Sequence, residues 1–539
     1  MPNTKEKPHP PRGSIYDEIK ELDKKITGLL GRRTELLAKA ASGRRSRKGK
    51  LADPRQEKEL WAIWKDVRES QNLDNAIWER IFSLTNSLAY ARTEQTRPEK
   101  GFNLFPKPAP LQLTFAGPPH LPATRGGLAL AAMLGGSLRI PGAVLNDPLI
   151  ELAKLLNQVE GKVSWDSEGI TSESDGALAF DNRTIFCGQD PFNLFLALAM
   201  TLPVFGIVKL TGGTSLRNFD LSVLQRFLPA IGARMVHLDP HSAGLPVRIE
   251  SSGVLPDEVH LPDWVPPSFV HAMLIGWTGH RKKTRFFWDG SRDEELFPGW
   301  LKDLLSRFGS RMHTRGGHLE ISGFDLHAPK LLSLPMDPVA TGYALGLPAG
   351  RGGFVKAEGI WPDTDEGAKI LEKLRAFLTV EASPEGIQAR FRNMVASNSV
   401  AFTPLSFALA VISGRETLLE ITGDDQDLEF ALETGEVLGL DLARLPGEFK
   451  VGRTSRSQPA GTPPTIHAPT PEWAMALALI STFRPGFTLS NPGIVSSLWP
   501  QFWNIYNETP LIPGGTQKRE TNDTPHVPKQ RKRIESKDH

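Results

Sequence analysis

With 539 residues the chain is too long for one ordinary core, and its length favours three or four globular units. A hydrophobic fraction of 40% and a charged fraction of 23% are typical of a soluble globular protein, and a formal net charge of +2 gives no reason to expect a nucleic acid or membrane partner. Cys187 is the only cysteine, which excludes an intramolecular disulfide and a cysteine-based zinc site, and its apolar neighbours predict a buried thiol.

Both ends of the chain are predicted to be polar terminal segments. Residues 1–13 are rich in Pro and Lys, residues 511–539 are basic, and both are expected to be disordered. The first residues lack the apolar stretch of a secretory signal, and no apolar run approaches the roughly 20 residues that span a membrane. We therefore expect a cytoplasmic protein.

Three amphipathic helices are predicted next, over about 15–41, 52–70 and 74–94. Helices of this length cannot bury much apolar surface alone, so we expect them to form a homodimer with a second copy of the chain. The apolar positions of the first helix are Ile15, Ile19, Leu22, Ile26, Leu29, Leu30 and Leu37.

After a Pro-rich stretch at 95–110, which predicts a linker, a repeat begins. Small, apolar helix starts recur six times, between 65 and 76 residues apart. Most are followed by a second helix that ends in a Gly-bearing turn and a short strand, as in "LLSRFGSRMHT" (304–314). Repeats of this length indicate six duplicated α/β subdomains rather than a solenoid. The helix starts are "RGGLALAAML" (125–134), "FNLFLALAM" (192–200), "SFVHAMLIG" (268–276), "VATGYALGL" (339–347), "PLSFALAVI" (404–412) and "EWAMALALI" (472–480).

Three stretches carry a resemblance to 5-enolpyruvylshikimate-3-phosphate (EPSP) synthase over about 105–510. They are "LTGGTSLRNFDLSVLQRFLPAIGA" (210–233), "MDPVATGYALGLPAGRGGFVKAEGI" (336–360) and "FRPGFTLSNPGIVSSLWPQFW" (483–503). The first helices, with "LDKKITGLLGRRTELL" and "DPRQEKELW", similarly resemble the all-helical chorismate mutase domain.

Together the two resemblances imply an α/β fold of two globules built from six βαβαββ units, preceded by three helices. The implied boundaries are 14–94 for the helical domain, 111–120 with 327–510 for globule one, and 121–326 for globule two.

The resemblance to EPSP synthase implies a site for two anions, shikimate 3-phosphate and phosphoenolpyruvate, which needs several Arg and Lys side chains and acid–base groups. This chain departs from that pattern. The Gly-Ser-Lys-Ser-x-x-x-Arg pattern falls on 119–126, where Leu121 replaces the Lys, and Arg125 is one residue out of register. The fifth unit offers "GDDQDLE" (423–429), which is acidic where cations are expected.

Some positions do match the two families. The resemblance implies catalytic roles for Asp337 and, in the helical domain, Glu57. It implies no metal and no cofactor, and it adds chorismate as a further anionic ligand. The residues that it assigns to substrate binding are Arg125, Ser215, Arg217, Ser268, Arg33 and Arg44.

Each assignment has a structural alternative. Asp337 precedes a Pro and could be a helix N-cap. Arg125 could be a solvent-facing residue of a first turn, and Arg217 could form an ion pair that stabilises a turn. Arg33 and Glu57 could form a salt bridge between helices.

Three functions remain open at this point. The first is a divergent 3-phosphoshikimate 1-carboxyvinyltransferase, which transfers enolpyruvyl from phosphoenolpyruvate to shikimate 3-phosphate. The second is a catalytically inactive relative that serves aromatic biosynthesis as a scaffold or regulator. The third is enolpyruvyl transfer to a less charged acceptor.

Overall fold

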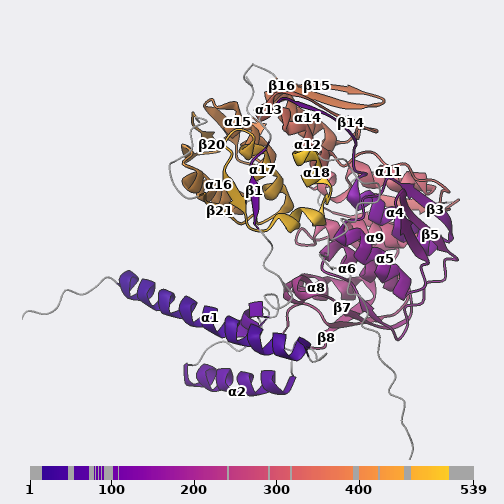
Figure 1. Ribbon diagram of the computed structural model, residues 1–539. Helices are drawn as coiled ribbons and strands as arrows, with labels where there is room; N and C mark the ends of the chain where they lie inside the picture. The colour runs from indigo at the N-terminus through magenta and orange to yellow at the C-terminus, as the bar shows by residue number, and fades with distance from the viewer. Residues whose placement is uncertain are drawn as a thin grey trace, which may run out of the picture.

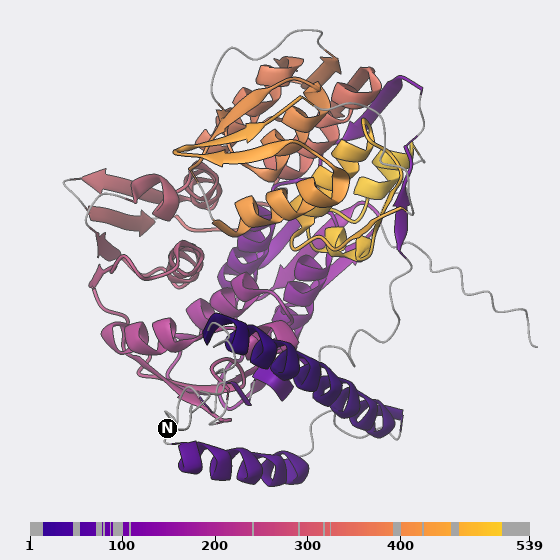
Figure 2. The ribbon, with the colours of Figure 1, turned by 90° about the vertical axis from the view of Figure 1, so that its left-hand side faces the viewer.

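The computed structural model of the chain shows a helical segment followed by two globules (Figures 1 and 2). It describes residues 15–46, 54–71, 78, 81–82, 84–86, 88–89, 101–106, 109–239, 242–288, 292–315, 318–323, 325–391, 400–422, 425–453 and 463–508.

The N-terminal segment is helical, as predicted. Helix α1 spans Ile15–Ser46 and α2 spans Pro54–Gln71. The residues of the predicted third helix that the structure describes are also helical. Aromatic rings pack the second and third helices together, with Trp61 5.2 Å and Trp64 5.4 Å from Phe82 between ring centroids.

Globule two contains the first three units of the repeat. Unit one comprises α4 (Leu121–Leu134), β3 (Gly136–Pro141), α5 (Asp147–Gln158), β4 (Val163–Asp166) and β5 (Gly169–Ser174). Unit two comprises β6 (Thr184–Phe186), α6 (Pro191–Thr201), β7 (Gly206–Thr211), α7 (Thr214–Asn218), α8 (Ser222–Phe227), the 3-10 helix η1 (Leu228–Ile231), β8 (Ala233–His237) and β9 (Val247–Ser251). Unit three comprises β10 (Glu258–His260), α9 (Pro267–Gly279), β11 (Thr284–Phe287), α10 (Asp293–Leu296), α11 (Gly299–Arg307), β12 (Ser310–Arg315) and β13 (His318–Gly323).

Globule one contains the last three units. Unit four comprises β2 (Leu111–Ala116), α12 (Pro338–Gly346), α13 (Pro348–Arg351), β14 (Gly353–Glu358), α14 (Asp365–Phe377), β15 (Leu378–Ser383) and β16 (Gly386–Phe391). Unit five comprises β17 (Val400–Ala401), α15 (Pro404–Ser413), β18 (Thr417–Glu420), α16 (Asp425–Leu438), β19 (Leu442–Leu445) and β20 (Glu448–Val451). Unit six comprises β1 (Phe102–Leu104), β21 (Thr465–Ile466), α17 (Pro471–Ser481), β22 (Phe487–Leu489), the 3-10 helix η2 (Pro492–Ser497) and α18 (Phe502–Asn507).

The strands of the described residues form six sheets, one for each unit. The four-stranded sheets share one order, seen in β6-β7-β9-β8, β10-β11-β13-β12, β2-β14-β16-β15 and β17-β18-β20-β19. In each of them the first two strands are parallel and the others antiparallel, as a β-helix-β crossover followed by a hairpin requires. Four units thus have the complete βαβαββ order, units one and six have three-stranded sheets, and the prediction of six α/β units is confirmed.

One buried helix from each unit builds the two cores. We call α4, α6, α9, α12, α15 and α17 the core helices; they coincide with the six predicted helix starts, and apolar residues cover nearly their whole surface. In Figure 1 the first three lie in one globule and the last three in the other. The cores draw on residues 128–332 in globule two and on residues 104–115 and 336–506 in globule one.

The chain crosses between the globules twice. After β2 it passes into α4, and after β13 it returns to α12; Pro119 and Met336 form an antiparallel bridge where the two crossings meet.

Part of the predicted linker is instead a strand. Residues Phe102–Leu104 of β1 pair antiparallel with β22, and Leu104 is fully buried. Three residues between prolines and a glycine are too few to show a periodicity, which is why the sequence pattern predicts a linker there.

Two further expectations concern single features. Cys187 is buried, and burial raises the pKa of its thiol, so it is the inert thiol predicted. Among the described residues, no helix combines the length and the apolar character needed to cross a membrane.

Candidate functional site

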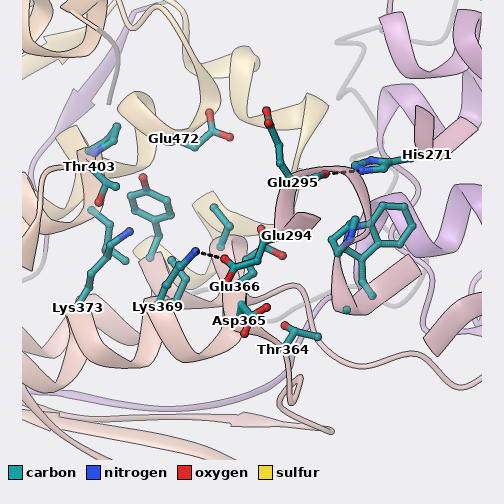
Figure 3. A pocket seen from close by; sticks show the side chains of 18 residues that line it. His271, Glu294, Glu295, Thr364, Asp365, Glu366, Lys369, Lys373, Thr403 and Glu472 are labelled. Atoms are coloured by element: carbon teal, nitrogen blue, oxygen red, sulfur yellow. Dashed lines mark hydrogen bonds and ion pairs between the residues drawn. The ribbon is translucent and has the colours of Figure 1, made fainter. Parts of the chain in front are cut away.

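A cavity of about 590 Å³ lies between the two globules (Figure 3). On the side of globule two it is lined by His271 of α9, Glu294 and Glu295 of α10, and Pro298, Gly299 and Trp300 at the start of α11. On the side of globule one it is lined by Val339, Tyr343, Thr364, Asp365, Glu366, Lys369, Ile370, Lys373, Thr403, Pro404, Leu405 and Glu472.

Three core helices begin at this cavity. Val339, Leu405 and Glu472 are the second residues of α12, α15 and α17. Each of these helices starts with a polar N-cap followed by Pro: the caps are Asp337, Thr403 and Thr470, and they accept the backbone N–H of the third helical residue. Pro has no N–H group, and the N-cap side chain accepts one further backbone N–H of the first turn. Each helix start therefore keeps few free N–H donors for an anion.

The charged side chains of the cavity are mostly acidic. Five carboxylates face only two ammonium groups, those of Lys369 and Lys373. Burial lowers the pKa of His271 to about 4, so its ring is neutral at pH 7 and adds no positive charge. The cavity therefore carries a negative net charge. The five carboxylates are those of Glu294, Glu295, Asp365, Glu366 and Glu472.

Ion pairs occupy several of these groups. Lys369 Nζ lies 3.2 Å from Glu294 Oε2, and Arg292 Nε lies 2.7 Å from Glu295 Oε2. His120 Nε2 lies 3.4 Å from Glu366 Oε2. Within the described part of the chain, Asp365, Lys373 and Glu472 form no ion pair.

A smaller cavity of about 240 Å³ adjoins the first and shares Trp300, Thr364 and Glu366 with it. The Trp300 ring lies 5.4 Å from the His120 ring and 5.4 Å from the His271 ring, between centroids. His120 Nδ1 accepts the N–H of Ala123, which leaves the Nε2 proton to face Glu366.

The two globules also touch directly beside these cavities. A Cβ atom placed on Gly299 of α11 would lie 3.0 Å from Cγ2 of Thr364, the N-cap of α14. A larger residue at position 299 would be tight against this methyl group, which would have to move by a few tenths of an ångström. This contact and the Lys369–Glu294 pair join α11 and α10 of one globule to α14 of the other, and the His120–Glu366 pair joins the N-cap of α4 to α14.

Arg125 lies away from the cavity, inside globule two. Its side chain is buried rather than solvent-facing, so that alternative is wrong. Nη1 donates to Asp190 Oδ1 at 2.6 Å and to Asn193 Oδ1 at 3.3 Å, and the guanidinium lies 4.8 Å from the centre of the Phe192 ring. Arg125 thus ties α4 to the start of α6.

Asp337 is the N-cap of α12, as the structural alternative states. Oδ1 accepts the N–H of Ala340 at 3.0 Å, and Oδ2 lies 3.5 Å from the N–H of Leu121 at the start of α4. Burial raises the pKa of this carboxyl group, although His120 nearby opposes the shift. Asp337 therefore holds the two chain crossings together.

The remaining predicted residues of globule two lie outside the lining of the large cavity. Ser215 and Arg217 are exposed on α7, where the N–H of Ser215 donates to Gln189 Oε1 at 3.0 Å. Arg217 forms no ion pair with any described residue, so the predicted turn-stabilising pair is not found. Ser268 is half-buried in the first turn of α9, one turn before His271.

The helical segment contains its own cavity, of about 390 Å³. Leucines line it together with Arg32 and Arg33. Arg33 donates to Thr85 Oγ1 at 2.9 Å and to Asn86 Oδ1 at 2.6 Å, and it lies over the rings of Trp64 and Phe82. Glu57 is half-buried in the first turn of α2, and the side chain of Arg44 lies outside the described residues.

Sequence reasoning missed most of the residues that line the large cavity. No sequence pattern points to Tyr343, Glu366, Lys373 or His271 as site residues. The one available signal is the polar residue and Pro that precede core helices, because N-termini of such helices converge at the cleft. Among the described residues, no group of His, Cys, Asp and Glu side chains is arranged to hold a metal ion.

Comparison with known proteins agrees with both resemblances. Residues 15–92 match the model of the family described as chorismate mutase type II. No protein of curated function matches the sequence.

Two solved structures of EPSP synthase from Acinetobacter baumannii align with this chain with a TM-score of 0.60 at 15% identity. The first alignment covers 76% of this chain and 98% of the synthase, and the second covers 78% and 100%. The enolpyruvyl transferase NikO from Streptomyces tendae aligns with a TM-score of 0.57 at 14% identity and covers 75% of this chain and 96% of its own. The chain thus has the EPSP synthase fold behind a segment that matches chorismate mutase type II, and both predicted resemblances are confirmed.

Proposed function

We propose that the chain serves aromatic biosynthesis as a catalytically inactive relative of EPSP synthase, a scaffold or regulator that does not transfer enolpyruvyl to shikimate 3-phosphate. The observation that carries this proposal is the charge of the cavity between the globules. Five carboxylates and two ammonium groups line the place where three core helices begin.

The reaction of EPSP synthase brings together two anions. Each phosphate carries about −1.5 to −2 charges at pH 7, and each substrate adds a carboxylate. A pair of like charges 4 Å apart costs about 4 kcal/mol at the effective dielectric constant of a protein surface. Of the two ammonium groups in the cavity, that of Lys369 is already paired with Glu294. Binding both substrates here would be strongly unfavourable.

The acid–base chemistry lacks support as well. Asp337 is the catalytic residue that the resemblance implies, but both its oxygens face backbone N–H groups at helix starts. A general base needs a lone pair within reach of the proton that it removes. Transfer to a less charged acceptor would still need cations for phosphoenolpyruvate. We therefore favour the inactive relative over the divergent synthase and over enolpyruvyl transfer to a less charged acceptor.

The helical segment supports a homodimer. Ile15, Ile19, Leu22, Ile26 and Leu29 of α1 are all exposed in the single chain, between 45% and 75%. Their spacing alternates four and three residues, which is the repeat of paired helices. A stripe of this kind marks an interaction surface. We propose that α1 pairs with its copy in a second chain.

Phosphate release tests the proposed function. The purified full chain is mixed with shikimate 3-phosphate and phosphoenolpyruvate, with the EPSP synthase of Acinetobacter baumannii as the positive control under the same conditions. We expect phosphate release no faster than in the blank without protein. Turnover comparable to that of the control enzyme would overturn the proposal and restore the divergent synthase.

A further inference from the structure

In the large cavity the Lys373 ammonium, the Tyr343 hydroxyl and the Glu472 carboxylate form no ion pair or hydrogen bond within the described part of the chain, and neither does the exposed carboxylate of Asp365. They belong to α14, α12 and α17 of globule one. In Figure 3, Lys373 projects from α14 toward the side of the cavity on which Glu472 lies. Apart from the exposed Asp365, the cavity thus presents one unpaired charge of each sign.

Tyr343 offers the cavity a hydrogen-bonding group between the two charges. Its side chain is 2% exposed, and its hydroxyl forms no hydrogen bond with any described residue. Buried tyrosine hydroxyls nearly always have a partner, because an unsatisfied one loses its hydrogen bond to water. Tyr343 lines the cavity and its hydroxyl is not one of the fully buried atoms without a partner, so the hydroxyl is open to a hydrogen-bond partner in the cavity, which is water or a ligand.

Lys373 and Glu472 set the charges of that molecule. Lys373 is half-buried, and burial together with the neighbouring Lys369 lowers the pKa of its ammonium. Glu472 is half-buried in the first turn of α17. A ligand with a single charge would compensate one of them and leave the other unpaired. Asp365, the other unpaired carboxylate, is exposed to solvent in the first turn of α14.

Apolar side chains complete the lining. Val339, Ile370 and Leu405 of globule one face Trp300 of globule two. A volume of about 590 Å³ falls within the roughly 300–1,000 Å³ of small-molecule sites.

We propose that the cavity between the globules binds a free amino acid with an apolar or aromatic side chain, with its carboxylate on Lys373 and the Tyr343 hydroxyl and its ammonium on Glu472. This inference rests on the proposed function, because a cavity that holds an amino acid does not hold the two phosphate substrates at the same time. Under the proposed regulatory role, this amino acid is the small molecule whose binding the chain would sense.

Three ligands that differ only in charge test the proposal. Isothermal titration calorimetry on the full chain would compare L-phenylalanine with 3-phenylpropanoate, which lacks the ammonium, and 2-phenylethylamine, which lacks the carboxylate. We expect phenylalanine to bind at least about tenfold more tightly than either analogue, because each analogue leaves one charge of the site unpaired. No heat with phenylalanine up to about 10 mM, or equal affinity for an analogue, would overturn the proposal.

Three substitutions assign the contacts. Tyr343→Phe should weaken phenylalanine about tenfold without loss of stability, because the hydroxyl has no partner in the unliganded chain. In Lys373→Met, phenylalanine and 2-phenylethylamine should bind equally, and in Glu472→Gln, phenylalanine and 3-phenylpropanoate should bind equally. Lys302→Met and Glu433→Gln, which change exposed residues outside the cavity, are the matched controls and should leave all affinities unchanged.

The two proposals fail separately. If phosphate release is absent and phenylalanine does not bind, only the ligand is wrong. If phosphate is released at the rate of the control enzyme, the proposed function is wrong whatever the calorimetry shows. Unchanged affinity in Tyr343→Phe would place phenylalanine elsewhere on the chain and overturn the site.

Discussion

The buried ion pair between Arg125 and Asp190 should be a structural element of globule two, and replacing its two partners should have unequal costs. Arg125 is 6% exposed, and its Nε is buried without a hydrogen-bond partner in the described structure. The carboxylate of Asp190 is 24% exposed and also accepts the N–H groups of Phe192 and Asn193 as the N-cap of α6. Asp190 therefore has other partners, whereas Arg125 depends on Asp190.

Asp190→Asn keeps a good N-cap and removes only the charge. It leaves the buried guanidinium without a counter-charge, which costs about 3–5 kcal/mol. Arg125→Met keeps most of the apolar volume and leaves a carboxylate that is still capped and partly hydrated. Its cost is the loss of the hydrogen bonds to Asp190 and to Asn193, about 1.5–3 kcal/mol for the charged pair. The double variant should cost less than the sum of the two, because neither charge is then left unpaired.

Hydrogen exchange followed peptide by peptide over α4 and α6 measures these costs inside globule two alone. Asp190→Asn should speed exchange there by roughly a hundredfold to a few thousandfold, and Arg125→Met by less. Peptides of α12 and α15 in globule one should be unaffected. Arg139→Met, which breaks an exposed ion pair with Asp166 in the same globule, is the control and should change little.

The opposite order of costs would refute this reasoning. If Arg125 served to hold an anionic ligand, Asp190→Asn would be nearly neutral for stability and Arg125→Met would weaken binding of phosphoenolpyruvate. We expect neither, and the affinity for phenylalanine should be the same in Arg125→Met as in the original chain.

The remaining predictions concern Asp337 and α1. Because burial raises the pKa of Asp337 in the folded chain, ionising Asp337 lowers the stability of the fold as pH rises above the unfolded pKa of about 3.9. The urea midpoint of Asp337→Asn should therefore rise relative to that of the original chain between pH 4 and pH 7. A relative rise toward lower pH would contradict this prediction. The double variant Ile19→Asp with Ile26→Asp should convert a dimer to a monomer, as measured by light scattering. The control Lys25→Asp, at an exposed polar position of α1, should leave the measured mass unchanged. If the original chain is itself a monomer, the proposed interface is wrong.

The architecture could be predicted because it repeats. Each core helix is apolar over nearly its whole surface, and such helices recur at similar intervals, so six units are visible without an alignment. The short strands follow from Gly-bearing turns; Gly232, for example, has a φ of 80° and separates η1 from β8. Strand β1 escaped the prediction because its partner, β22, lies nearly 400 residues away in the sequence.

The candidate site could be predicted only in part, because it depends on contacts between residues that are far apart in the sequence. The sequence shows that cations are missing at the helix starts, but not which carboxylates replace them in space. Lys369 and Glu294 meet across two globules although 75 residues separate them. Arg125 reads as a residue of an exposed first turn because its partner, Asp190, belongs to another unit. Charge pairing between units depends on how the units pack against one another and leaves no local pattern in the sequence.

The helix starts also explain how the fold could persist without the cations of an anion site. Five of the six core helices have an N-cap side chain that accepts a backbone N–H, and every core helix carries Pro in its first turn. Carboxylates near a helix N-terminus stabilise the helix, whereas Arg and Lys gathered there oppose its dipole and repel one another until an anion binds. Glu472 in the first turn of α17, and Asp365 and Glu366 in the first turn of α14, therefore stabilise the free chain and disfavour the binding of phosphates. This is the direction expected under the proposed function, in which the fold is kept and the catalytic site is not.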